Sequence, residues 1–207
     1  MLRTLRVLHK SPSTQALALT RMKVIAAAML AFAFSGQLWA ERPPIVLADS
    51  SVGSFDISPG KMISVLRLRN AFPFYRVTQE IREGDSPDYH LFTVATYEGE
   101  KVVSFISYIT DESMYEQAVV PLDEVLLVGG PAIDQYGVAP GERLSSALKK
   151  RKELEFGYGH MDSYLGRGKI WYLFYAGAPE GTRATFEQAK ESDPEIAVIS
   201  WPKPRWR

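Results

Sequence analysis

Residues 89–110 of the chain have the sequence YHLFTVATYEGEKVVSFISYIT. Residues 89–97 and 101–110 are rich in β-branched and aromatic side chains, and a short turn with one glycine, Glu98-Gly99-Glu100, separates them. This pattern predicts a β-hairpin. Apolar side chains fall on both faces of residues 101–110, which is typical of a strand in the middle of a sheet. We therefore expect the chain to fold around an antiparallel sheet.

The flanking sequence predicts two main helices and several more strands. The first helix is expected at residues 58–72, where Ser58 and Pro59 suit a first turn and apolar residues recur at spacings of three and four. The second is expected at residues 140–152. Further strands are expected at residues 75–82, 119–128, 170–175 and 196–201, and a short helix at residues 183–190. The predicted fold class is α+β, a largely antiparallel sheet with two main helices packed on one face.

A short internal repeat accompanies the two helices. Residues 59–64 (PGKMIS) and 140–145 (PGERLS) share the pattern P-G-x-x-(I/L)-S at an offset of 81 residues. Duplication of one helix-then-strands unit would produce this pattern. The alternative is that Pro-Gly is ordinary punctuation before a helix.

The first 40 residues have the pattern of a secretory signal peptide. Residues 24–34 form an apolar run of 11 residues behind Arg21 and Lys23, and a small residue, Ala40, stands at the expected cleavage point. The run is short of the roughly 20 residues that span a bilayer as a helix. We predict cleavage after Ala40, with Met22 as an alternative start, and a single exported domain at residues 41–207 in the periplasm. The alternatives are a transit peptide and an uncleaved signal that tethers the protein to the membrane.

Charge and cysteine content exclude several classes of function. Residues 41–207 carry 19 basic and 24 acidic side chains, a formal net charge of −5. An acidic domain argues against nucleic acid and against an anionic membrane surface as partners. The chain has no cysteine, so it forms no disulfide, thiolate metal site or lipid-anchored lipobox.

The segment 157–164, GYGHMDSY, is the strongest candidate binding loop in the sequence. Tyr158, His160, Asp162 and Tyr164 supply hydrogen-bonding groups beside glycines, as in functional loops. The alternative is a plain connection between strands. His160 and Asp162 could join His90 around a metal ion, but no paired ligand spacing supports this, and we predict no metal and no cofactor.

Catalytic and charged motifs are sparse. No G-x-S-x-G element is present, and only Ser54 and Ser163 offer weak openings for a nucleophile, so we predict no enzyme. Residues 149–152 (KKRK) form the one basic run after residue 40. We interpret it as a solvated helix end, with binding of an anionic envelope polymer as the alternative. Trp206 in the basic tail either docks on the sheet or presents a contact.

Residues 133–141 (IDQYGVAPG) lead into the second helix, and the chain closes on residues 199–201 (ISW) and a Trp- and Arg-rich end. In these features it is similar to a family of small uncharacterised envelope lipoproteins of Gram-negative bacteria that are regulated by sigma-E. The likeness covers the order of elements in the C-terminal two-thirds of the chain. It implies an envelope location and a mixed α+β fold. Those proteins carry a lipobox cysteine that this chain lacks, so lipid anchoring does not transfer.

Together these patterns predict a non-catalytic periplasmic binding protein with a protein partner in the envelope. The expected role is inhibition of, or immunity to, an envelope or cell-wall enzyme. The alternative is a binder of a small ligand or envelope polymer that uses residues 157–164, and the third hypothesis is a hydrolase.

Overall fold

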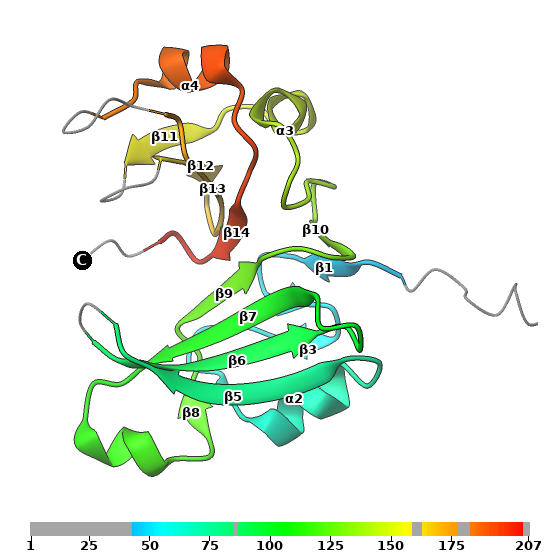
Figure 1. Ribbon diagram of the computed structural model, residues 1–207, viewed down its shortest axis with the longest axis vertical. Helices are drawn as coiled ribbons and strands as arrows, with labels where there is room; N and C mark the ends of the chain where they lie inside the picture. Colours follow the sequence, from blue (N-terminus) through cyan, green and yellow to red (C-terminus); the bar gives the residue numbers. More distant parts are fainter. Residues whose placement is uncertain (1–42, 85–86, 159–162, 178–182, 205–207) are drawn as a thin grey trace, which may run out of the picture. The chain divides into compact units, whose positions relative to one another are not determined.

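The predicted hairpin lies inside an eight-stranded antiparallel sheet (Figure 1). The computed structural model describes residues 43–84, 87–158, 163–177 and 183–204. The predicted signal peptide, residues 1–40 with Met22 and Ala40, lies outside them, as do His160, Asp162 and Trp206. In sheet order the strands are β11 (Glu155–Tyr158), β12 (Ser163–Arg167), β13 (Ile170–Phe174), β14 (Val198–Trp201), β9 (Glu124–Leu127), β7 (Lys101–Tyr108), β6 (Tyr89–Ala95) and β5 (Arg76–Arg82).

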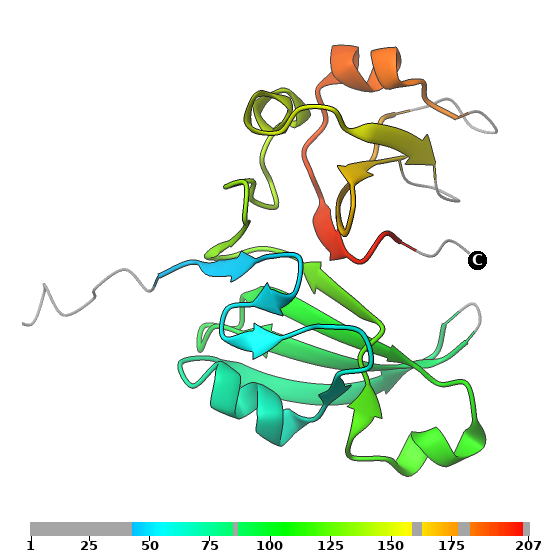
Figure 2. The same cartoon turned by 180° about the vertical axis from the view of Figure 1, so that it is seen from behind.

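Two shorter sheets complete the β-structure. One has the order β10 (Ala132–Asp134), β1 (Ile45–Leu47), β2 (Ser51–Val52) and β3 (Phe55–Asp56), and its β1–β10 pair is parallel. The other pairs β4 (Met62–Ile63) with β8 (Val120–Pro121). The ring of Phe55 in β3 lies 5.5 Å from that of Phe105 in β7, so the first short sheet packs against the large one (Figure 2, blue and cyan).

The helices are shorter than their sequence patterns predict. The first, α2 (Val65–Ala71), begins seven residues after the predicted start, because residues 62–63 pair with β8 and Ser64 caps the helix through the N–H of Arg67. The second, α3 (Leu144–Lys150), also begins later than predicted. A 3₁₀ helix, η1 (Glu112–Glu116), and α4 (Phe186–Ser192) complete the helices of the described residues.

One predicted strand is divided in two. The prediction for residues 119–128 merges β8 and β9, which belong to different sheets. Asp123 stands between them, and its carboxylate accepts a hydrogen bond from the N–H of Tyr108 at 2.8 Å. The side chain thus takes the place of a backbone partner where the chain changes sheets.

The mixed α+β class and the largely antiparallel sheet are confirmed. Strand β7 is buried on both faces, as predicted for a central strand. The main apolar core joins both halves of the large sheet, through side chains that include Phe105, Leu127, Tyr172 and Ile199. A smaller cluster lies around α3 and α4 and includes Leu144, Leu165, Phe174 and Ala189. None of the helices in the described residues is long and apolar enough to cross a membrane.

Candidate anion-binding site

The predicted binding loop is flanked by strands on both sides. Residues 155–158 and 163–167 form an antiparallel pair, with Tyr158 opposite Ser163 and Gly157 opposite Tyr164. The interpretation of residues 157–164 as one loop is therefore wrong at both ends. His160 and Asp162, between the strands, lie outside the described residues.

The two predicted tyrosines do not converge. Residues directly opposite in an antiparallel pair share a face, and neighbours along a strand alternate, so Tyr158 and Tyr164 lie on opposite faces of the sheet. The Tyr158 ring packs 5.4 Å from that of Phe156, and the Tyr164 ring packs 5.5 Å from that of Trp171. Gly157 is needed because a Cβ there would lie 2.4 Å from the Tyr164 ring. These described residues form no shared binding site.

His90 has a structural role. It is buried on β6, with Nε2 2.7 Å from the carbonyl oxygen of Met114 and Nδ1 3.2 Å from Nε2 of Gln79. The carbonyl requires a donor, so Nε2 carries the proton and Nδ1 accepts from Gln79. Both ring nitrogens are occupied, and no group of three metal-ligating side chains exists among the described residues.

A different site forms where the end of α3 meets the turn between β12 and β13. A cavity of about 610 Å³ opens there. Five of its described lining residues are cationic and one is acidic; the full lining is Asp49, Tyr136, Lys150, Arg151, Lys152, Arg167, Gly168 and Lys169. We call this cavity the basic pocket. It brings together four segments that are far apart in the sequence.

Part of the positive charge of the basic pocket is not neutralised within the described residues. Lys150 pairs with Glu142 at 2.6 Å, and Arg167 pairs with Glu153 at 2.6 Å. Lys152 and Lys169 form no ion pair with any residue in the described ranges. Such a surplus in a concave site attracts anions.

Arg151 anchors the floor of the pocket. Its side chain is buried, with 7% of the residue exposed, and its guanidinium donates to the carbonyl oxygens of Ile170, at 2.9 Å, and of Arg167. The guanidinium carbon also lies 4.4 Å from the ring centre of Tyr136. Because Arg151 binds carbonyls on both sides of the β12–β13 turn, it fixes the segment that presents Arg167 and Lys169.

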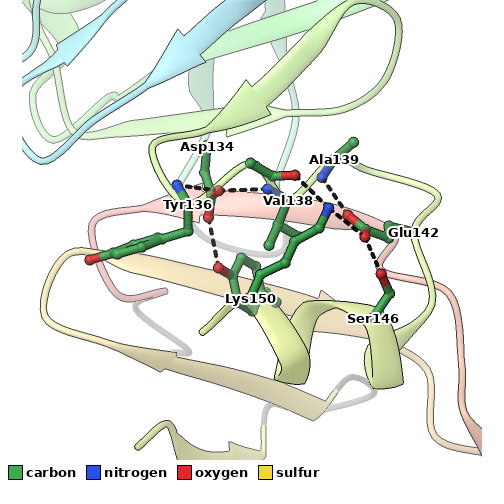
Figure 3. A network of polar contacts seen from close by, with 9 residues as sticks. Asp134, Tyr136, Val138, Ala139, Glu142, Ser146 and Lys150 are labelled. Carbon is green, nitrogen blue, oxygen red and sulfur yellow. Dashed lines mark hydrogen bonds and ion pairs between the residues drawn. The ribbon is translucent and has the colours of Figure 1, made fainter. Parts of the chain in front are cut away.

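Asp134 organises the wall that carries Tyr136 (Figure 3). This buried carboxylate accepts from the N–H groups of Tyr136 and Val138 at 2.9 and 2.8 Å, and from the hydroxyl of Tyr172 at 2.7 Å. Burial and the charge of Asp134 raise the pKa of Tyr172 above its ordinary value. The phenol therefore stays a donor, and the turn at Tyr136 is held rigidly.

Glu142 connects the start of α3 to Lys150 near its end (Figure 3). Its carboxylate accepts from the N–H of Ala139 at 3.1 Å, from the hydroxyl of Ser146 and from Lys150. Burial acts to raise the pKa of Glu142, but the bonds from Lys150, Ser146 and Ala139 outweigh it and hold the pKa below its usual value. Glu142 is thus ionised at neutral pH and fixes one wall of the pocket.

The sequence analysis saw only half of this site. It singled out residues 149–152 and favoured a solvated helix end, whereas the structure places Lys150, Arg151 and Lys152 in a cavity. The missed half is Arg167-Gly168-Lys169, a turn in which Gly168 has a φ of +66°. Two cations flanking a turn glycine were a signal, but nothing in the sequence joins that turn to α3.

The fold and pocket define an α+β protein with a cationic cavity whose described lining holds no histidine, serine or cysteine. No protein-family model and no curated protein matches the chain. Among solved structures it is similar to the uncharacterized protein yfeY from Escherichia coli, with a TM-score of 0.52 and 13% sequence identity. The match covers 76% of this chain and 99% of that chain, and at this identity it shows a likeness of fold alone.

Proposed function

We propose that this protein is a non-catalytic binding protein of the bacterial envelope, and that the basic pocket binds an anionic ligand. One observation carries the proposal: five cationic side chains and a single carboxylate line one cavity in a domain whose own net charge is negative. A volume of about 610 Å³ is in the range of small-molecule sites.

The pocket is also held in place before any ligand arrives. Arg151 is buried and hydrogen-bonded, and the Tyr136 turn is bonded to Asp134. A preformed site loses little side-chain entropy on binding. This supports a ligand site over an ordinary solvated helix end.

A thermal-shift experiment with pyrophosphate tests the proposal. A ligand that binds only the folded state raises the melting temperature, so pyrophosphate should raise it relative to sodium chloride at equal ionic strength. The variant Lys152→Ala/Lys169→Ala should lose most of this rise, because it removes the two cations without ion pairs.

Lys149→Ala is the matched control. Lys149 is exposed in the same basic run but does not line the pocket, so this variant should keep most of the rise. An equal loss in both variants, or no rise in the wild-type protein, would contradict the proposal.

A protein partner is the second candidate. In this hypothesis the protein inhibits, or gives immunity to, an envelope or cell-wall enzyme. Two large apolar side chains support it: Leu66 on α2 is 69% exposed, and Phe74 just after the helix is 68% exposed. Exposed apolar side chains are common in protein interfaces when they cluster. Affinity capture from periplasmic extract tests the hypothesis, with Leu66→Ser as the comparison; an identical set of bound proteins for both forms would count against it.

Export is part of the proposal as well. The apolar run of residues 24–34, Ala40 and the likeness to sigma-E-regulated envelope lipoproteins support a periplasmic location. Mass spectrometry of protein recovered from the periplasm should find Glu41 at the N-terminus. A mass that retains residues 24–40 would favour the membrane-tethered alternative.

We also propose that the two halves of the large sheet arose from one repeated unit, each with its helix on the sheet. The strand order supports this: α2 precedes β5–β6–β7–β9, and α3 precedes β11–β12–β13–β14, with β9 and β14 paired in the middle. The two Pro-Gly glycines have φ values of +80° and +84°. A second cavity, of about 390 Å³, includes Arg69, which stands 81 residues before Lys150. An alignment of homologues that conserves the 81-residue offset would test the duplication.

A further inference from the structure

We infer that the ligand of the basic pocket is an anionic sugar, a saccharide unit carrying a phosphate or similar acidic group. The inference rests on the proposed function and adds a chemical class to it. It follows from an aromatic ring that lies beside cations inside the same cavity.

Tyr136 is the aromatic component. Its ring lines the pocket, and 40% of the residue is exposed although its backbone N–H is bonded to the buried Asp134. The Arg151 guanidinium lies 4.4 Å from the ring centre, so the ring cannot turn into the core on that side. An exposed aromatic ring held rigidly beside a polar site offers apolar contact area at low entropic cost. A sugar ring has apolar C–H faces that suit it.

The cations supply the second component. Lys152 extends from the end of α3, and Lys169 extends from the β12–β13 turn; both line the cavity without an ion pair among the described residues. A group with one or two negative charges could contact both. A neutral sugar would leave these charges unsatisfied, and an inorganic anion would leave the Tyr136 ring uncovered.

Titration calorimetry with glucose 6-phosphate, inorganic phosphate and glucose tests this inference. We expect glucose 6-phosphate to bind about tenfold more tightly than inorganic phosphate, a difference of about 1.4 kcal/mol. Glucose alone should show no measurable binding. Adenosine monophosphate serves as a competitor class, because a nucleobase could also stack on tyrosine.

Two substitutions at Tyr136 separate ring contact from charge. Tyr136→Leu should lower the affinity for glucose 6-phosphate to that for inorganic phosphate, and leave the phosphate affinity within about twofold of wild type. Tyr136→Phe keeps the ring and should keep the affinity. Lys152→Ala/Lys169→Ala should abolish binding of both anions.

The outcomes distinguish this inference from the proposed function. If both anions bind equally and Tyr136→Leu changes nothing, the sugar inference is overturned and anion binding stands. If no anion binds, both are overturned. Tighter binding of adenosine monophosphate than of glucose 6-phosphate also overturns the sugar class.

The source of the sugar is tested separately. Vesicles that carry lipid A present a phosphorylated disaccharide, and phosphatidylcholine vesicles are the neutral control. Co-sedimentation with lipid A vesicles, abolished in Lys152→Ala/Lys169→Ala, would support the inference with a lipid-borne sugar. Binding of glucose 6-phosphate without co-sedimentation would support it with a soluble one.

Discussion

Asp134 shows how one buried carboxylate organises this protein at the scale of a residue. It binds two backbone N–H groups of the following turn and the hydroxyl of Tyr172, on a strand of the large sheet. A buried charge is tolerated only when it is well hydrogen-bonded. The same bonds position Tyr136 in the wall of the basic pocket.

Tyr172→Phe tests the contribution of this network. The substitution leaves one oxygen of Asp134 without its donor and should lower the free energy of unfolding by about 1–3 kcal/mol. Urea denaturation measures the change. Tyr175→Phe, at a residue that is 64% exposed, is the control and should change stability little. Equal effects of the two substitutions would contradict this account.

Glu124 gives a prediction of pH dependence. Its carboxylate accepts from the hydroxyls of Tyr108 and Ser200, both at 2.9 Å, and burial raises its pKa above the ordinary value. A raised folded-state pKa contributes stability that is present below the unfolded pKa and is lost as pH rises through the folded pKa. Glu124→Gln does not titrate, so its stability relative to wild type should rise with pH above the unfolded pKa. Urea denaturation from pH 4 to 8 measures this, and a constant difference would contradict it.

At the scale of elements, strands decide where the helices begin. Pro59 and Gly60 suit a helix start, yet residues 62–63 pair with β8 before α2 begins. A local pattern reports the propensity for a helix, whereas the pairing depends on a segment about 60 residues away. The predicted hairpin needed no such distant information and was confirmed as β6 and β7.

Two glycines in β12 and its partner β11 should respond differently to alanine. A Cβ on Gly166 would lie 2.6 Å from the carbonyl oxygen of Ile170 and 2.8 Å from the Cα of Trp171, so the backbone must move. Gly166→Ala should therefore lower the free energy of unfolding by about 1–3 kcal/mol. It should also weaken pyrophosphate binding, because it displaces the turn that carries Arg167 and Lys169.

Gly157→Ala is the matched control for this prediction. Its Cβ would meet only the outer atoms of the Tyr164 ring, which can move more easily than backbone. Chemical denaturation should therefore find the smaller loss in Gly157→Ala. The reverse order would show that the β12–β13 turn is more adaptable than its contacts indicate.

At the scale of the whole molecule, net charge and local charge differ in sign. Residues 41–207 carry a net charge of −5, which argued against anionic partners, yet five cations meet in one cavity. A sum over the chain contains no information about which charges become neighbours.

The shared core predicts that residues 43–207 unfold as one unit. Apolar side chains from both halves of the large sheet belong to a single cluster, and β9 pairs directly with β14. Tryptophan fluorescence and far-ultraviolet circular dichroism should therefore report the same urea midpoint. Two separate transitions would indicate that the proposed repeat units are independently stable.

The sequence by itself determined the α+β class, the central hairpin and the absence of disulfides, because alternation, turn chemistry and composition are local properties. It also marked part of the basic pocket, through residues 149–152. Only the tertiary structure decided that Tyr158 and Tyr164 lie on opposite faces of a strand pair, and that the end of α3 meets Arg167 and Lys169. Strand register and the meeting of distant segments depend on long-range packing, and no local pattern in the chain encodes them.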